Sequence, residues 1–85
     1  MRNLKDRIRA FMREEFKKSG FHDDIGDDAS LIQADILDSL SILKLISFMD
    51  EEFSVIPNED ELSPEKLDSI NLIADFITKK SAQSS

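Results

Sequence analysis

The chain has 85 residues, of which 40% are hydrophobic and 34% are charged, and its formal net charge is −7. A chain of this length forms one small domain and leaves little room for a deep enzyme pocket beside a hydrophobic core. The absence of cysteine excludes disulfides, thiolate metal sites and cysteine nucleophiles, and the lack of tyrosine and tryptophan, with few glycines and prolines, argues against an all-β fold.

The charge is divided unevenly along the chain. Residues 1–20 contain seven basic and three acidic residues, whereas residues 21–62 contain twelve acidic residues and one base, Lys44. An acidic middle section disfavours binding to nucleic acid, whose phosphates it repels. It suits docking to basic patches on partner proteins, although simple solubilisation is the plainer alternative.

No part of the sequence indicates a membrane segment. No apolar run approaches the ~18 residues of a membrane span, and the charged start of the chain lacks the apolar core of a signal peptide. We therefore expect a cytoplasmic protein without a membrane span.

A first amphipathic helix is predicted over roughly residues 3–18. Its apolar residues recur at helical spacing and form one face. They are Leu4, Ile8, Phe11, Met12 and Phe16. Ser19-Gly20 should end this helix, because glycine readily takes the left-handed conformation that follows a helix. Basic residues on its other faces are expected to pair with acids of the same chain rather than with RNA or a membrane.

Residues 20–38 read as a long loop that is rich in acids. Aspartates crowd around Gly26 at positions 23, 24, 27 and 28, but their spacing does not fit an EF-hand. Whether this Asp23–Asp28 cluster binds a cation stays open, and no specific metal site is predicted. His22, which has no histidine or cysteine partner nearby, is expected at the surface rather than in a catalytic role.

A second helix is predicted from Ser39 to Phe53. One stripe of this helix should face the core, and it comprises Ile42, Leu45, Ile46, Met49 and Phe53. The opposite side carries the residues that we predict to dock partners. They are Leu40, Leu43, Lys44, Ser47, Asp50 and Glu51. Two exposed leucines rimmed by charge resemble a partner surface, although the 20–38 loop is an alternative cover for them.

The remaining sequence predicts two further helices. Pro57 prevents the second helix from continuing, and Ser63-Pro64 is a start signal for a short third helix. Asp68-Ser69 then caps a fourth helix that ends near Lys79-Lys80. We expect an all-α domain over residues 1–80 and a disordered tail over residues 81–85.

The dipeptide Asp38-Ser39 lies where the loop meets the second helix. Either residue is able to cap this helix, and Ser39 would then sit at its mouth. Unpaired N–H groups and the positive end of the helix dipole favour an anion there, such as a phosphate on the Ser39 hydroxyl.

A catalytic role for this dipeptide has less support. A nucleophilic serine needs a base, and nothing marks His22 as that base. Acid–base work by Asp35 and Asp38 would need a pocket, so an enzyme is a distant alternative. The chain is therefore expected to be a substrate and partner of enzymes.

The order of these features resembles the acyl carrier protein family over about residues 3–80. The resemblance is carried by Asp38-Ser39-Leu40 after a long loop, by the acidic helix end before Ile56-Pro57, and by the Ser63–Ile70 stretch. The triplet Asp68-Ser69-Ile70 is similar in form but lacks this context. The resemblance implies a monomeric four-helix bundle with one short helix and a long loop between helices 1 and 2.

The same resemblance implies a function. A phosphopantetheinyl transferase would attach 4′-phosphopantetheine from coenzyme A to Ser39, with Asp38 beside it. The group's thiol would carry acyl or aminoacyl intermediates as thioesters to loading and transfer enzymes. Four residues are candidates to shelter the acyl chain, namely Ile42, Ile46, Leu62 and Ile70.

Two departures from the fatty-acid-synthesis pattern shift the expected pathway. Lys44 stands where an acidic recognition residue is usual, and Ser41 replaces another acid. The resemblance therefore points to a stand-alone carrier of a specialised lipid, polyketide or related pathway. The alternative function is an unmodified acidic helical interaction module.

Overall fold

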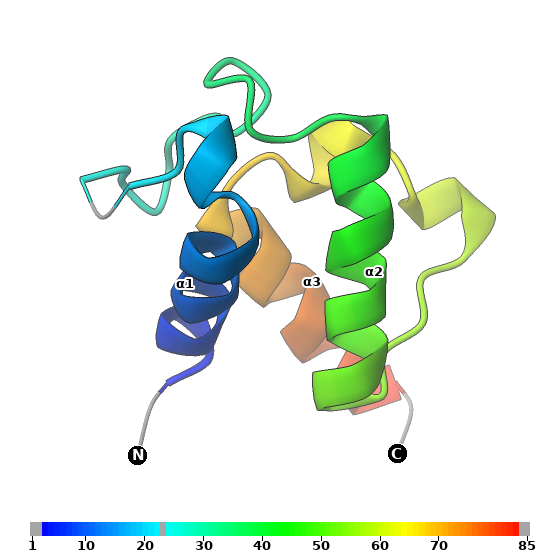
Figure 1. Ribbon diagram of the computed structural model, residues 1–85. Coiled ribbons are helices and arrows are strands. Elements are labelled where there is room, and N and C mark those ends of the chain that lie inside the picture. Colours follow the sequence, from blue (N-terminus) through cyan, green and yellow to red (C-terminus); the bar gives the residue numbers. More distant parts are fainter. Residues whose placement is uncertain (1–2, 23, 84–85) are drawn as a thin grey trace.

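The computed structural model describes residues 3–22 and 24–83, with the side chains of these residues apart from Ser19, Ser39, Ala82 and Gln83. This part of the chain forms three α-helices and three 3-10 helices, and no β-strand (Figure 1). In chain order they are α1 (Leu4–Glu15), η1 (Lys17–Ser19), α2 (Ser39–Phe53), η2 (Glu59–Glu61), η3 (Pro64–Leu67) and α3 (Ile70–Gln83). The prediction of an all-helical chain is confirmed.

Helix α1 begins with a side-chain cap and ends in a tightened turn. The Asn3 side chain accepts a hydrogen bond from the Asp6 N–H at 2.8 Å, which satisfies one of the free donors of the first turn. The α-helix stops at Glu15, and η1 continues the coil to Ser19. Gly20, with φ of 105°, ends it with a positive φ that glycine adopts more readily than other residues.

Helix α2 has the bounds that the sequence predicts. Asp38 precedes it in extended conformation, and Ser54 closes it in the left-handed region with φ of 56°. Leu45 and Met49 are fully buried, and the partly buried Ile46 packs against the same core. The predicted core stripe of this helix is therefore confirmed.

The short helix predicted after Ser63 is the 3-10 helix η3, so the described residues contain three α-helices rather than four. Pro64 has no N–H, and the four residues of η3 leave almost no room for the i to i−4 bonds of an α-helix. Ser63 occupies the position before η3 without a capping hydrogen bond from its side chain.

The last helix differs from its prediction at the C-terminal end. Ser69 begins it as expected, because its Oγ accepts the Leu72 N–H at 3.1 Å. The backbone of α3 stays helical to Gln83, beyond the predicted end near Lys80. The helix thus enters the 81–85 segment for which we predicted a disordered tail, since serine, alanine and glutamine there do not break a helix. Residues 84–85 lie outside the described part.

The helices share one core. Helix α3 packs against both α1 and α2, and it lies between them in Figure 1. Side chains from α1, α2, η3, α3, the 20–38 loop and the residues next to two helix ends fill the interior. The fully buried large ones are Phe16, Ile8, Met12, Leu31, Ile36, Leu45, Met49, Leu67, Ile70, Ile73 and Val55. Leu31 and Ile36 show that the long loop is held on the core by its own apolar residues.

Candidate functional site

The mouth of α2 is built by Asp38. One oxygen of its carboxylate accepts the N–H of Leu40 at 3.0 Å and the N–H of Ser41 at 2.8 Å. This cap makes Ser39 the first residue of the helix. The backbone of Ser39 is thus placed as predicted, while its side chain lies outside the described part of the structure.

The cap corrects one part of the prediction for Ser39. Unpaired N–H groups were expected to favour a phosphate there, yet Asp38 already occupies the N–H groups of Leu40 and Ser41. The carbonyl of Asp38 accepts the next one, from Ile42. An anion on Ser39 would therefore gain from the helix dipole but would lie next to a carboxylate.

The same cap perturbs the acidity of Asp38. The hydrogen bond from the Ser41 N–H, with smaller effects from the Leu40 N–H and the charge of Lys44, holds the pKa of the Asp38 carboxyl below its usual value. A carboxyl whose pKa is lower in the folded state than in the unfolded state stabilises the fold at pH values above its unfolded-state pKa. This stabilisation is lost as the pH falls through the folded-state pKa.

We predict that Asp38→Asn weakens this acid dependence. Asparagine caps helices about as well, so the stability at pH 7 should change little. As the pH falls below about 4, the ordinary range of aspartate, the original chain should lose more free energy of unfolding than the variant. Urea titrations followed by circular dichroism at several pH values measure this, and parallel pH curves for the two proteins would contradict it.

The other serines near the two Asp-Ser pairs are buried. Ser41 is 7% exposed and its Oγ donates to the carbonyl of Ile36 at 3.0 Å. Ser69 is 6% exposed and caps α3. Ser41 is not among the predicted docking residues of α2, and its burial agrees with that. Its position borders the core stripe, so an acid there would be buried rather than presented to a partner.

The loop that leads to Ser39 is anchored from the far end of the chain. Both carboxylate oxygens of Asp68 accept from Ser30 Oγ, at 2.9 and 2.8 Å, and one of them also accepts the N–H of Ile32 at 2.8 Å. The backbone carbonyl of Asp68 accepts the N–H of Leu31 at 2.6 Å. Sequence reasoning treated Asp68 only as part of a helix start and missed this role.

The turn that Asp68 anchors is itself hydrogen-bonded to the start of α2. The carbonyl of Leu31 accepts the N–H groups of both Ile36 and Leu37. Ile36 in turn holds the hydroxyl of Ser41 in the first turn of α2. A continuous set of hydrogen bonds thus runs from Asp68 to the helix mouth.

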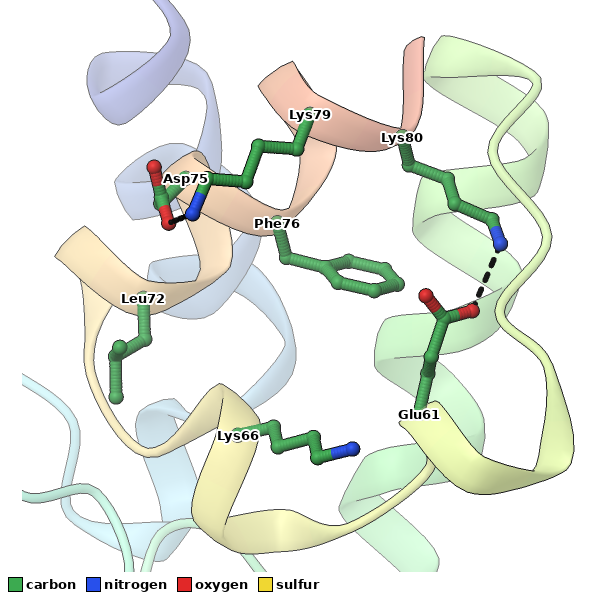
Figure 2. A pocket seen from close by; sticks show the side chains of 7 residues that line it. All are labelled: Glu61, Lys66, Leu72, Asp75, Phe76, Lys79 and Lys80. Carbon is green, nitrogen blue, oxygen red and sulfur yellow. Dashed lines mark hydrogen bonds and ion pairs between the residues drawn. The ribbon is translucent and has the colours of Figure 1, made fainter. Parts of the chain in front are cut away.

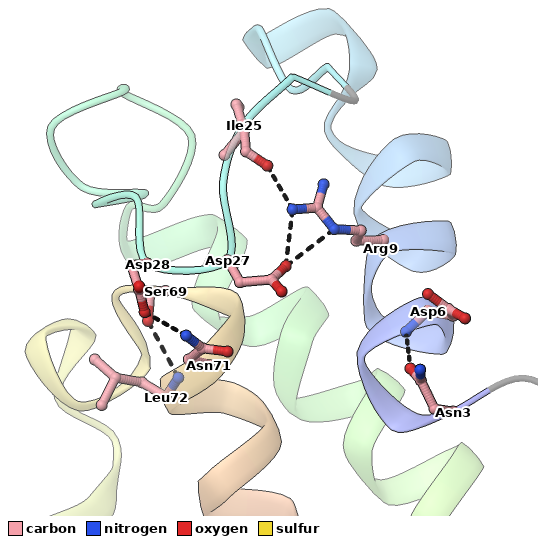
Figure 3. Close-up of polar contacts among 9 residues, drawn as sticks. All are labelled: Asn3, Asp6, Arg9, Ile25, Asp27, Asp28, Ser69, Asn71 and Leu72. Carbon is pink, nitrogen blue, oxygen red and sulfur yellow. Dashed lines mark hydrogen bonds and ion pairs between the residues drawn. The ribbon is translucent and has the colours of Figure 1, made fainter.

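The acidic part of the loop is also tied to helices. Asp27 forms an ion pair with Arg9 of α1 at 2.8 Å, and Asp28 accepts a hydrogen bond from the Asn71 amide of α3 (Figure 3). The expected pairing of α1 bases with acids of the same chain is therefore confirmed at Arg9. Among the described residues no three ligands are grouped as a metal ion requires, and Asp23 lies outside them. His22 is exposed, as predicted.

The predicted docking residues of α2 lie at the surface. Leu40 and Leu43 are 67% and 61% exposed, so the loop does not cover them. The charged and polar members of the set are exposed as well, namely Lys44, Ser47, Asp50 and Glu51. Their exposure fits a docking surface, and the docking itself stays a prediction.

A cavity of about 340 Å³ lies between η2, η3 and α3 (Figure 2). Phe76 and Leu72 supply its apolar wall, and Lys80 bridges to Glu61 at 2.8 Å. The N–H of Asn58, and then Lys80, hold the pKa of Glu61 below its usual value. The candidates for an acyl shelter do not line this cavity. Ile42 and Ile70 are buried in the core, and Ile46 and Leu62 are half-buried.

None of the helices in the described part of the chain has the length and apolar character needed to cross a membrane. Comparison with models of protein families, with curated proteins and with solved structures finds no match to this chain.

Proposed function

We propose that this protein is a carrier of the acyl carrier protein type, modified on Ser39 with 4′-phosphopantetheine. The observation that supports it best is the placement of Ser39 as the first residue of α2, capped by Asp38 and followed directly by the exposed Leu40. This combination puts a serine at a helix mouth beside an apolar surface. The other two serines of the Asp-Ser regions, Ser41 and Ser69, are buried.

We also propose that these helices form the four-helix bundle of a carrier protein. Helices α1, α2 and α3 correspond to the three long helices of a carrier bundle, and η3 corresponds to its short helix. The loop over residues 20–38 takes the place of the long connection before the modified serine.

Each part of the site has a role in this proposal. Asp38 fixes the first turn of α2, so that the Ser39 backbone is held. The Ser39 hydroxyl, losing its proton, would attack the pantetheine-side phosphorus of the coenzyme A pyrophosphate. The new phosphodiester would form as the P–O bond to adenosine 3′,5′-bisphosphate breaks and that group leaves. The attached group supplies a thiol that holds an acyl or aminoacyl unit as a thioester. The exposed face of α2 docks the transferase and the loading and transfer enzymes. The protein itself supplies the attachment site and the docking surface rather than a catalytic group.

The test is an intact-mass measurement after incubation with coenzyme A, Mg²⁺ and a broad-specificity phosphopantetheinyl transferase. We expect a gain of one phosphopantetheine, which Ser39→Ala abolishes. Ser69→Ala is the matched control, because it alters the serine of the similar Asp-Ser-Ile triplet and should retain the full gain. No mass gain in the original chain, or a mass gain that persists in Ser39→Ala, would contradict the assignment of Ser39 as the modified residue.

A second candidate function is an unmodified acidic helical interaction module. The exposure of Leu40 and Leu43 on a helix that also presents Asp50 and Glu51 favours it. This function predicts partner binding through α2 with no change of mass under the same conditions.

A further inference from the structure

A groove between α1 and α2 has an aromatic floor. The rings of Phe11 and Phe48 stack with their centroids 4.2 Å apart. Each also meets another ring edge-on, Phe16 on the side of α1 and Phe53 on the side of α2. Two hollows of about 320 and 350 Å³ share Phe11, Phe48 and Glu52 in their linings. The stacked pair therefore underlies both hollows, which together make one groove.

The floor of this groove is only half-covered by the protein itself. Phe11 and Phe48 pack against the core from its edge, and both keep part of their surface exposed. Helix α3 packs against both neighbouring helices, while α1 and α2 meet through these large side chains. An apolar floor between two helices is a shape onto which a further helix lays its apolar face.

The rim of the groove is predominantly acidic. Glu14 from α1 lines one hollow, and Glu15 from α1 and Glu51 from α2 line the other. All three side chains are exposed, and none forms an ion pair with a residue that the structure describes. Lys44 is the cation on the rim of the second hollow.

Arg7, the other cation at the groove, already interacts with residues of this chain. Arg7 forms an ion pair with Glu52 at 2.9 Å, and its guanidinium lies 4.4 Å from the centre of the Phe53 ring. This arrangement neutralises Glu52, and the three remaining glutamates outnumber Lys44, so the rim keeps a net negative charge. The groove thus offers apolar contact at its floor and a net negative charge at its rim.

We propose that this groove binds a basic amphipathic helix of a partner protein. Its apolar face would lie on Phe11 and Phe48, and its lysines or arginines would face Glu14, Glu15 and Glu51. Complementary charge would speed the encounter and fix the orientation of the helix. This groove shares Lys44, Ser47 and Glu51 with the predicted docking face of α2, but Leu40 and Leu43 do not line it. Its binding does not depend on modification of Ser39.

The test uses a leucine–lysine peptide of about 15 residues, the length of α2, with leucines at helical spacing. It is titrated into the Ser39→Ala chain by fluorescence anisotropy, with amide chemical shifts locating the site. We expect the shifts to centre on Phe11 and Phe48. Glu15→Lys with Glu51→Lys should weaken binding about ten-fold.

The matched control changes the same net charge elsewhere. Glu59→Lys with Glu65→Lys alters exposed residues of η2 and η3 and should weaken binding by less than about three-fold through long-range charge alone. Equal weakening by both pairs, absence of binding, or shifts centred on Leu40 and Leu43 would overturn the proposal. Because the titration uses Ser39→Ala, its failure leaves the carrier function untouched, and a missing mass gain leaves the groove untouched.

Discussion

Replacing Leu31 by alanine is expected to lower the free energy of unfolding by about 3 kcal/mol, because a fully buried leucine leaves a cavity when it is truncated. Leu31 is 0% exposed, the smallest exposed fraction among the apolar residues of the 20–38 loop. The backbone bonds of its turn remain possible in the variant, so the loss measures the side chain. Urea unfolding followed by far-ultraviolet circular dichroism is the measurement.

The neighbouring residue provides the control for Leu31. Ile32 is 36% exposed in the same turn, and Ile32→Ala should cost less than about 1 kcal/mol. If the two alanine variants were equally destabilised, the loop would not be held on the core through Leu31.

Removal of the Asp68 carboxylate is expected to be the second large effect. Asp68→Ala breaks the hydrogen bonds from Ser30 Oγ and the Ile32 N–H together, and it should cost about 2 kcal/mol, since hydrogen bonds to a charged group are among the stronger ones. Amide exchange at Ile32 should speed up, while exchange in the middle of α2 should change less.

Two comparisons isolate the contribution of Asp68 to the free energy of unfolding. Asp75→Ala removes an exposed ion pair with Lys79 on the same helix and should cost less than about 0.5 kcal/mol. A double-mutant cycle with Ser30→Ala then gives the coupling between Ser30 and Asp68. Additive losses would show that the two residues do not interact and would remove the proposed anchor.

The sequence predicted helix α2 well because several local signals agree there. Asp38 supplies a cap, the apolar period continues without interruption, and Ser54 with the following residues ends it. The exposure of Leu40 and Leu43 followed from the same period. Each of these features depends on residues close together in the chain, which is why they could be predicted.

The contacts that were missed join distant residues. Ser30 and Asp68 are separated by 38 positions, and no local pattern indicates that they pair. Ser41 lies at the border of the core stripe, and its burial depends on the Ile36 carbonyl that the loop brings beside it. The end of α3 was placed too early, because neither a breaker nor a strong stop signal marks the true boundary.

The position of Asp68 in the sequence determines when the loop before Ser39 becomes anchored during translation. Translation produces Ser39 well before it produces the residues that anchor the loop, at positions 68 and 71. A nascent chain that has emerged only as far as η2 therefore carries the serine and its Asp38 cap without the contacts from Asp68 and Asn71 that anchor the loop. The anchoring of the loop before the helix mouth is completed only after the start of α3 has left the ribosome, so an enzyme that recognises the anchored shape acts only once residues 68 and 71 have emerged.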